Sequence, residues 1–194
     1  MKTTLLSAAI VATLVSAPVL AGGDATAGKA KAVVCAACHG ADGNSAAGAF
    51  PKLAGLGEKY LIKQMTDIKT GERVVAEMTG MLDNSSDQDI ADIAAYYAQQ
   101  KRALAGAEDN EKLLSLGENI YRAGNGNAPA GYPALGGQHA QYLAKQLRAF
   151  RTAAHDEENQ TGRKNDESKV MRSVSARLND REIDALANYI SGLH

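Results

Sequence analysis

The chain has 194 residues, enough for one large domain or two small ones. Its 21 Lys and Arg residues are balanced by 22 Asp and Glu residues, and no basic stripe occurs, so charge gives no support to nucleic-acid binding. With only two cysteines, no tryptophan and 5% aromatic residues, two domains would have few bulky side chains for their cores. A buried cofactor would complete such cores.

Residues 1–21 have the features of a secretory signal peptide. Lys2 gives a short basic start, an apolar run follows from Leu5 to Ala17, and small residues precede a cleavage site after Ala21. A retained membrane anchor fits less well, because the run is shorter than the roughly 20 residues that span a bilayer and contains Ser and Thr. We therefore expect export to the periplasm and no transmembrane segment in the mature protein.

Apolar residues at three- to four-residue spacing predict helices along the rest of the chain. In the first half these cover residues 27–39, 57–69 and 86–101, and similar patterns recur in the second half. No alternating pattern of strands joined by hairpin turns is visible. The fold is predicted to be all-α.

Local signals mark where several of these helices begin and end. Ser86 with Asp89, and Asn179 with Glu182, have the spacing of a capping box at a helix N-terminus. Gly71 is typical of a residue that ends a helix.

The chain is a tandem duplication. A shift of 82 residues aligns one block and a shift of 93 a second: Phe50, Pro51, Leu53, Tyr60 and Gln64 with Tyr132, Pro133, Leu135, Tyr142 and Gln146, and Met78, Ile90 and Tyr96 with Met171, Ile183 and Tyr189. We predict two small all-α domains, residues 22–103 and 104–194, joined by a linker near 102–111.

The two copies differ in length at two places. Between the aligned blocks the second copy gains 11 residues in 153–168, a charged stretch that we expect to form a solvated loop. Gly28 aligns with Gly117 at a shift of 89, so the second copy lacks about seven residues where the first has CAACHG (35–40). The second copy therefore has no Cys-x-x-Cys-His motif.

The Cys35-x-x-Cys38-His39 motif fits several kinds of site unequally. A zinc site would need two further Cys or His ligands at finger spacing, and a thioredoxin-like dithiol would need a βαβ pattern. A disulfide would close only a very small loop. Covalent attachment of a c-type haem fits best, with Cys35 and Cys38 as thioethers and His39 below the iron.

One axial position of such a haem lies opposite His39. Met78 and Met81, in a loop before the last helix of the first half, are the candidates for it. A Met ligand would raise the reduction potential and leave no open site for a substrate. A ligating His commonly donates its second N–H to a carbonyl, and the carbonyl of Pro51 is the expected acceptor.

These motifs resemble those of the cytochrome c4 family, periplasmic proteins with two tandem cytochrome c domains, over essentially the whole mature chain. The segments that carry the resemblance are GDATAGKAKAVVCAACHGADGNS, FPKLAG, EMTGMLDNSSDQDIADIAAYYAQQK, NAPAGYPALGGQHAQYLAKQL and ALANYISGLH. The resemblance implies that Cys35 and Cys38 bind haem, that His39 and Met78 (not Met81) are its axial ligands, and that Pro51 supports the His.

The resemblance also implies a function. Members of the family are electron carriers, not enzymes, and shuttle electrons between a quinol-oxidising complex and terminal oxidases. We expect a monomer whose second half could dock it peripherally on a membrane complex. The alternative is a haem enzyme, or a sensor of peroxide or a gas, in which Met78 detaches from the iron.

The chain departs from the family in its second half. The family carries two haems, but the sequence predicts one, because the second motif is missing and Met171 has no Cys pair or proximal His beside it. His139 is expected to be exposed or to cap a helix, and His194 is terminal. The half without haem could collapse helix on helix, dock on the first half or be partly disordered. The loop before Met78 is also shorter than in the family.

Overall fold

The computed structural model describes residues 22–123 and 132–193. Its helices are α1 (Ala25–Lys31), η1 (Ala32–Val34), α2 (Ala36–His39), α3 (Glu58–Thr70), η2 (Ala76–Met78), α4 (Asp87–Ala98), α5 (Glu111–Ala123), α6 (Ala140–His155), α7 (Val170–Ser175) and α8 (Asp180–Ser191). The all-α prediction is confirmed. Within the described ranges no helix is long and apolar enough to cross a bilayer. The expected signal peptide, residues 1–21, lies outside them.

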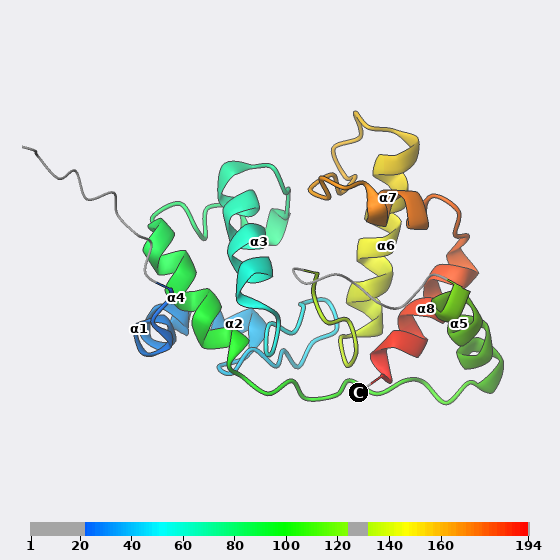
Figure 1. The fold of residues 1–194 in the computed structure, drawn as a ribbon, viewed down its shortest axis with the longest axis horizontal. Helices are drawn as coiled ribbons and strands as arrows, with labels where there is room; N and C mark the ends of the chain where they lie inside the picture. Colours follow the sequence, from blue (N-terminus) through cyan, green and yellow to red (C-terminus); the bar gives the residue numbers. More distant parts are fainter. Residues whose placement is uncertain (1–21, 124–131, 194) are drawn as a thin grey trace, which may run out of the picture.

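Both halves are built around the same helix crossing (Figure 1). In the first half α1 packs on α4 at Gly28, where an added Cβ would lie 1.9 Å from the carbonyl oxygen of Asp92. In the second half α5 packs on α8 at Gly117, where a Cβ would lie 2.2 Å from the carbonyl oxygen of Ala185. Only glycine lets the backbones approach so closely. The duplication read from the sequence is thus present in three dimensions.

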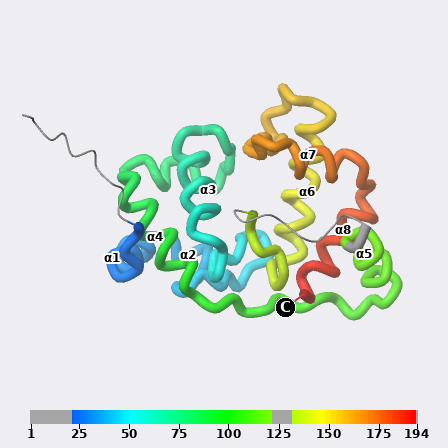
Figure 2. The backbone as a smooth tube through the Cα atoms, in the orientation of Figure 1, coloured from blue at the N-terminus to red at the C-terminus, as the bar shows by residue number. Residues whose placement is uncertain are grey.

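Each half has its own apolar core, formed mainly by the helices that surround this crossing. The core of the first half contains Ala32, Leu56, Leu61, Ile93, Ala94 and Tyr97, and that of the second contains Leu143, Ala144, Leu147, Ile183, Leu186, Ala187 and Ile190. Figure 2 shows the two groups of helices side by side, with the connecting chain below them.

The helix ends predicted at Ser86, Asn179 and Gly71 are confirmed, whereas the helix predicted over 27–39 is divided into α1, η1 and α2. Ser86 accepts a hydrogen bond from the Asp89 N–H and Asp89 accepts one from the Ser86 N–H, and Asn179 forms the same reciprocal pair with Glu182. Gly71 ends α3 with a left-handed φ of 82°. These caps pair backbone N–H and C=O groups that have no partner inside the helix, so local sequence signals mark these helix ends.

The second half is folded and docked on the first. The side chain of Gln138 accepts a hydrogen bond from the Lys52 N–H and donates one to the Lys52 carbonyl oxygen, each at 2.9 Å. In the linker, Arg102 donates to carbonyl oxygens of both halves, Ala54 on one side and Ala134 and Gly136 on the other. The second half thus has its own helix-on-helix core and is also docked on the first, while residues 124–131 lie outside the described ranges.

The predicted solvated loop is only partly solvated. Residues up to His155 continue α6, and Arg163, Asn165 and Asp166 are half-buried. The amide of Asn165 donates to Asp67 Oδ2 of the first half at 2.7 Å. The expectation for residues 153–168 was wrong for these three side chains, because Arg163 and Asn165 bind residues of the first half and Asp166 pairs with Arg172 of its own half.

Candidate functional site

A cavity of about 1000 Å³ lies where the two halves meet. Its lining in the first half comes from α2, α3, α4 and the segment around η2, and in the second half from the loop before α6 and from α6 itself. Cys35, Cys38, His39 and Met78 all line it. The structure therefore brings the predicted site residues to one cavity.

The two thiols lie one helical turn apart at the start of α2. Cys35 occupies the N-cap position of this helix and its carbonyl accepts the His39 N–H at 2.9 Å. Both cysteines are free thiols, Cys38 exposed and Cys35 partly buried, and burial raises the pKa of the Cys35 thiol. Within the described ranges no group of three or more His, Cys, Asp or Glu residues is arranged to hold a metal ion. The thiols thus suit covalent attachment better than a zinc site.

His39 is positioned to coordinate a metal through one defined nitrogen. Its side chain is 7% exposed, and its Nδ1 lies 2.9 Å from the carbonyl oxygen of Pro51. Since a carbonyl only accepts, Nδ1 carries the proton and Nε2 keeps its lone pair. Burial lowers the pKa of the imidazole, which favours the neutral form that binds metals. The ring of Phe50 meets His39 edge-on, with centroids 6.3 Å apart.

Met78 and Met81 both line the cavity but differ in exposure. Met78 is the last residue of η2 and is half-buried, whereas Met81 is 50% exposed. The Met81 N–H donates to the Met78 carbonyl at 3.1 Å, so the two thioethers sit on one tight turn. The more buried Met78 is the better candidate for an axial ligand.

The hydroxyl of Tyr97 is a feature of the site that sequence reasoning missed. Tyr97 is 1% exposed, lines the cavity and has no hydrogen-bond partner for its hydroxyl within the described ranges. Burial raises its pKa. The helical period of α4 places Tyr97 in the core, but a one-dimensional pattern does not show that its hydroxyl faces a cavity.

The second half contributes to the same cavity. Its lining includes Pro133, Leu135, Tyr142, Gln146 and Arg163. The copied positions Pro133, Leu135, Tyr142 and Gln146 were visible in the repeat, but a repeat alone does not show that both copies face a common space.

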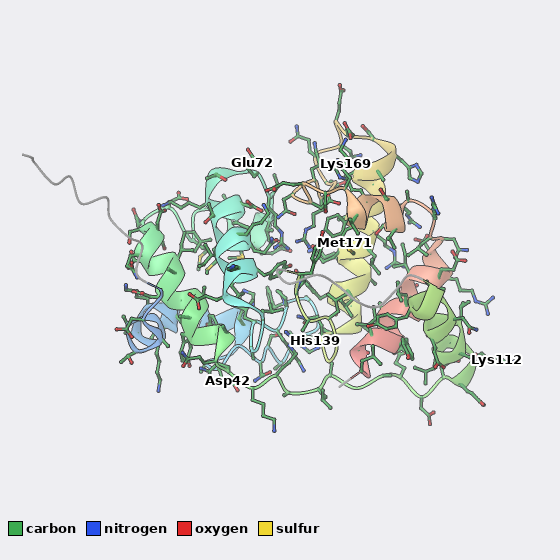
Figure 3. The ribbon with its side chains drawn as sticks, viewed as in Figure 1. Asp42, Glu72, Lys112, His139, Lys169 and Met171 are labelled. Carbon is green, nitrogen blue, oxygen red and sulfur yellow. The ribbon has the colours of Figure 1, made fainter. Side chains whose placement is uncertain are left out.

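Met171 and His139 do not line the cavity. Met171, on α7, packs partly buried against the core of its own half (Figure 3). His139 is the N-cap residue of α6, but its Nε2 lies 2.9 Å from the Ser45 carbonyl, so the expectation of an exposed or capping side chain was wrong. Its ring ties the halves together. His194 and the residues where a second attachment motif would stand, 124–131, lie outside the described ranges.

The lining fits a covalently attached haem. Two free thiols, a buried imidazole with a free Nε2, a thioether and an apolar cavity wall are the groups that such a haem requires.

Comparison with known proteins identifies similar chains over nearly the full length. The family model described as cytochrome c matches residues 25–101 and again 121–194. The chain is 51% identical over 191 residues to cytochrome c4 from Pseudomonas aeruginosa, with 90% of each chain covered. The crystal structure of reduced recombinant cytochrome c4 from Pseudomonas stutzeri superimposes with a TM-score of 0.79 and 46% identity, covering 89% of this chain and 100% of that one.

A further relative is named for a redox partner. The chain is 34% identical over 181 residues to a protein of Stutzerimonas stutzeri (strain A1501) named thiosulfate dehydrogenase electron acceptor, covering 84% of this chain and 80% of that protein.

Proposed function

Because the chain belongs to the cytochrome c family, and within it to the two-domain cytochromes c4, it is a c-type cytochrome with covalently bound haem c, and we propose that it carries single electrons on one such haem. The observation that carries this proposal is the single set of attachment and ligand residues, Cys35, Cys38, His39 and Met78, around one cavity. A bound haem c supplies a one-electron iron couple.

Each residue of this set has a separate task. Cys35 and Cys38 would hold the porphyrin through thioethers, so the cofactor would stay attached on reduction and oxidation. His39 would bind the iron through Nε2, while Pro51 fixes its ring and its tautomer through Nδ1. Met78 would supply the second protein ligand and raise the reduction potential relative to harder ligands.

The closed ligand set favours a carrier over an enzyme. A substrate, peroxide or a gas needs an open coordination position, and Met78 would fill it. Detachment of Met78 would convert the same site into a haem enzyme or sensor. Whether the Met78 thioether binds the iron therefore decides between the two functions.

The cellular setting follows from the sequence and the relatives. We propose that residues 1–21 direct export to the periplasm and that the chain acts there as a monomer. A quinol-oxidising complex would be the donor and a terminal oxidase the acceptor. The relative named thiosulfate dehydrogenase electron acceptor adds a thiosulfate dehydrogenase as a second donor. Rapid-mixing reduction by each purified donor would distinguish them.

The ligand assignment is tested by Met78→Ala with Met81→Ala as its matched control. The oxidised wild-type protein and Met81→Ala should show the weak red absorption band of methionine-ligated ferric haem, and Met78→Ala should lose it. Met78→Ala should also gain peroxidase activity, since its iron is open. A wild-type protein that lacks the band at neutral pH would favour the enzyme or sensor instead.

A further inference from the structure

A polar cluster occupies the boundary between the halves and lines the haem cavity. Its members are three pairs at equivalent positions of the two halves: Tyr60 and Tyr142, Gln64 and Gln146, Arg73 and Arg163. The tyrosines and glutamines correspond by the 82-residue shift of the repeat, and the arginines come from the loops after α3 and α6. The cluster is therefore roughly two-fold symmetric although only one half has an attachment motif.

Each arginine in the cluster reaches across to the other half. Arg163 donates to Gln146 Oε1 of its own half at 2.7 Å and to Gln64 Oε1 of the first half at 2.7 Å. Arg73 donates to Gln64 Oε1 at 2.8 Å, and to the Tyr142 hydroxyl of the second half at 3.1 Å. All of these acceptors are neutral.

The guanidinium of Arg163 is held in place by its surroundings. It lies over the ring of Phe150, a buried residue of α6, with 4.6 Å between its central carbon and the ring centroid. Its backbone N–H donates to the Ala149 carbonyl at 2.9 Å. The charge is thus positioned before any ligand arrives, at little cost in conformational entropy on binding.

Among the residues that the structure describes, neither arginine of the cluster has a carboxylate partner. The neighbouring Asp67 carboxylate is already bound by Lys63 at 2.9 Å and by the Asn165 amide. The Glu77 carboxylate pairs with Lys145. The cavity wall thus presents two half-buried guanidinium groups without a carboxylate partner among the described residues, and guanidinium groups are well suited to bind carboxylates. A third such cation, Lys164, is exposed and donates to the Glu157 carbonyl.

We propose that Arg163, a residue of the half without an attachment motif, is a cofactor-binding residue for the haem held by the first half. This inference rests on the proposed single haem. A haem c has two ionised groups, its propionate carboxylates, and Arg163 and Arg73 are the half-buried cations of the cavity, unpaired with any carboxylate of the described residues, that would receive them. The second half is thereby part of the redox site, and its positive charge stabilises the reduced iron.

The experiment compares the full-length holoproteins of Arg163→Gln, Arg163→Lys and the control Arg148→Gln. Arg148, on α6, pairs with Asp180 and Asp184 at an exposed face. Its replacement by Gln removes the same charge as Arg163→Gln, but away from the cavity. The reduction potential is measured by spectroelectrochemical titration over a range of pH, after haem content per chain has been determined.

At a fixed applied potential, Arg163→Gln should lower the ratio of reduced to oxidised protein by about three- to tenfold. A tenfold change corresponds to a shift of about 59 mV in the reduction potential of a one-electron couple. The pH-dependent region of Arg163→Gln should move to higher pH, because a carboxylate without its cation binds a proton more tightly. Arg163→Lys should retain most of the potential, and Arg148→Gln all of it.

Coincidence of Arg163→Gln with Arg148→Gln in both potential and pH profile would overturn the inference. If Arg163→Gln does not accumulate, Arg73→Gln takes its place with the same expected direction, and an unchanged potential there has the same negative meaning. A wild-type protein without haem would refute the proposed function as well. Haem-loaded variants with unaltered potentials would refute only the role of Arg163.

Discussion

The two halves share the same helix arrangement but differ in the residues available to bind a cofactor. Both cross their first and last helices at a glycine, Gly28 or Gly117, and both begin the last helix with a capping box. Only the first half has Cys35, Cys38 and His39. The second half nevertheless folds and docks, so the helix crossing and its caps specify the fold, and the attachment motif specifies the cofactor. In this duplication, the residues that specify the fold are therefore different from the residues that bind the cofactor.

The largest expected effect separates the halves by their cofactor. Replacing Cys35 and Cys38 together by Ser should abolish covalent haem completely, because no other cysteine exists in the chain. Intact mass and pyridine haemochrome should give one haem per chain for the wild type and none for the variant. A wild type that gains the mass of two haems would break the comparison.

The shared crossing is tested by Gly28→Ala and Gly117→Ala. Each added Cβ would meet a backbone oxygen of the partner helix at 1.9 or 2.2 Å, so each variant should lose roughly 1–3 kcal/mol of unfolding free energy, or more. Gly57→Ala is the control, since a Cβ there has no neighbour within 4 Å. Denaturant unfolding provides the measurement. If Gly117→Ala leaves the unfolding free energy unchanged, the crossing of α5 and α8 does not stabilise the second half.

A smaller effect is expected at the contact that joins the halves. Gln138→Leu copies the first half, whose equivalent residue is Leu56, and leaves the buried N–H and carbonyl of Lys52 without partners. The cost should be about 1–3 kcal/mol. Gln141→Leu, at an exposed position of α6, should cost little. Equal midpoints for the two variants in thermal unfolding would show that the reciprocal pair does not hold the halves together.

The smallest effect concerns the acid stability contributed by one buried carboxylate of the first half, Asp92. Asp92 is 3% exposed, and its hydrogen bonds from Lys31, the Asp24 N–H and Gln88 lower its pKa below the ordinary 3.8. A lowered pKa in the folded state stabilises the protein above pH 3.8, and this contribution is lost as pH falls through the lowered value. The equivalent residue of the second half, Ala185, cannot contribute.

Asp92→Asn should therefore flatten the loss of stability between neutral pH and acid, with a difference of about 1–2 kcal/mol at neutral pH that vanishes at low pH. The matched control is Asp83→Asn, an exposed carboxylate. Unfolding midpoints measured across this range check the prediction. If Asp92→Asn and wild type have parallel pH profiles, the buried carboxylate is not the acid-sensitive group.

Much of the fold could be predicted because its signals are local. The capping pairs at Ser86 and Asn179, the stop at Gly71 and the helical periods depend on neighbours along the chain. The repeat added a long-range relation, since aligned glycines and tyrosines must occupy equivalent places. The motif around Cys35 pointed to its cofactor for the same reason, because its residues are adjacent in sequence.

The parts that the sequence did not reveal depend on how the halves meet. Arg163 belongs to a charged stretch that looks solvated, and only docking shows that its guanidinium lies between Gln64 and Gln146. His139 similarly gains its partner, Ser45, from the other half. The hydroxyl of Tyr97 required the cavity itself to be seen. Contacts between distant segments leave no periodic pattern in the chain.

The anchoring of Arg102 has a consequence for how tightly the halves need to bind each other. Because a linker joins them, docking is an intramolecular event at a high effective concentration, so a few polar contacts can hold together halves that would bind more weakly as separate chains. Arg102 also binds the linker to loops of both halves, so the linker is held in place at this residue. The covalent connection therefore sets both the local concentration of the second half and its orientation.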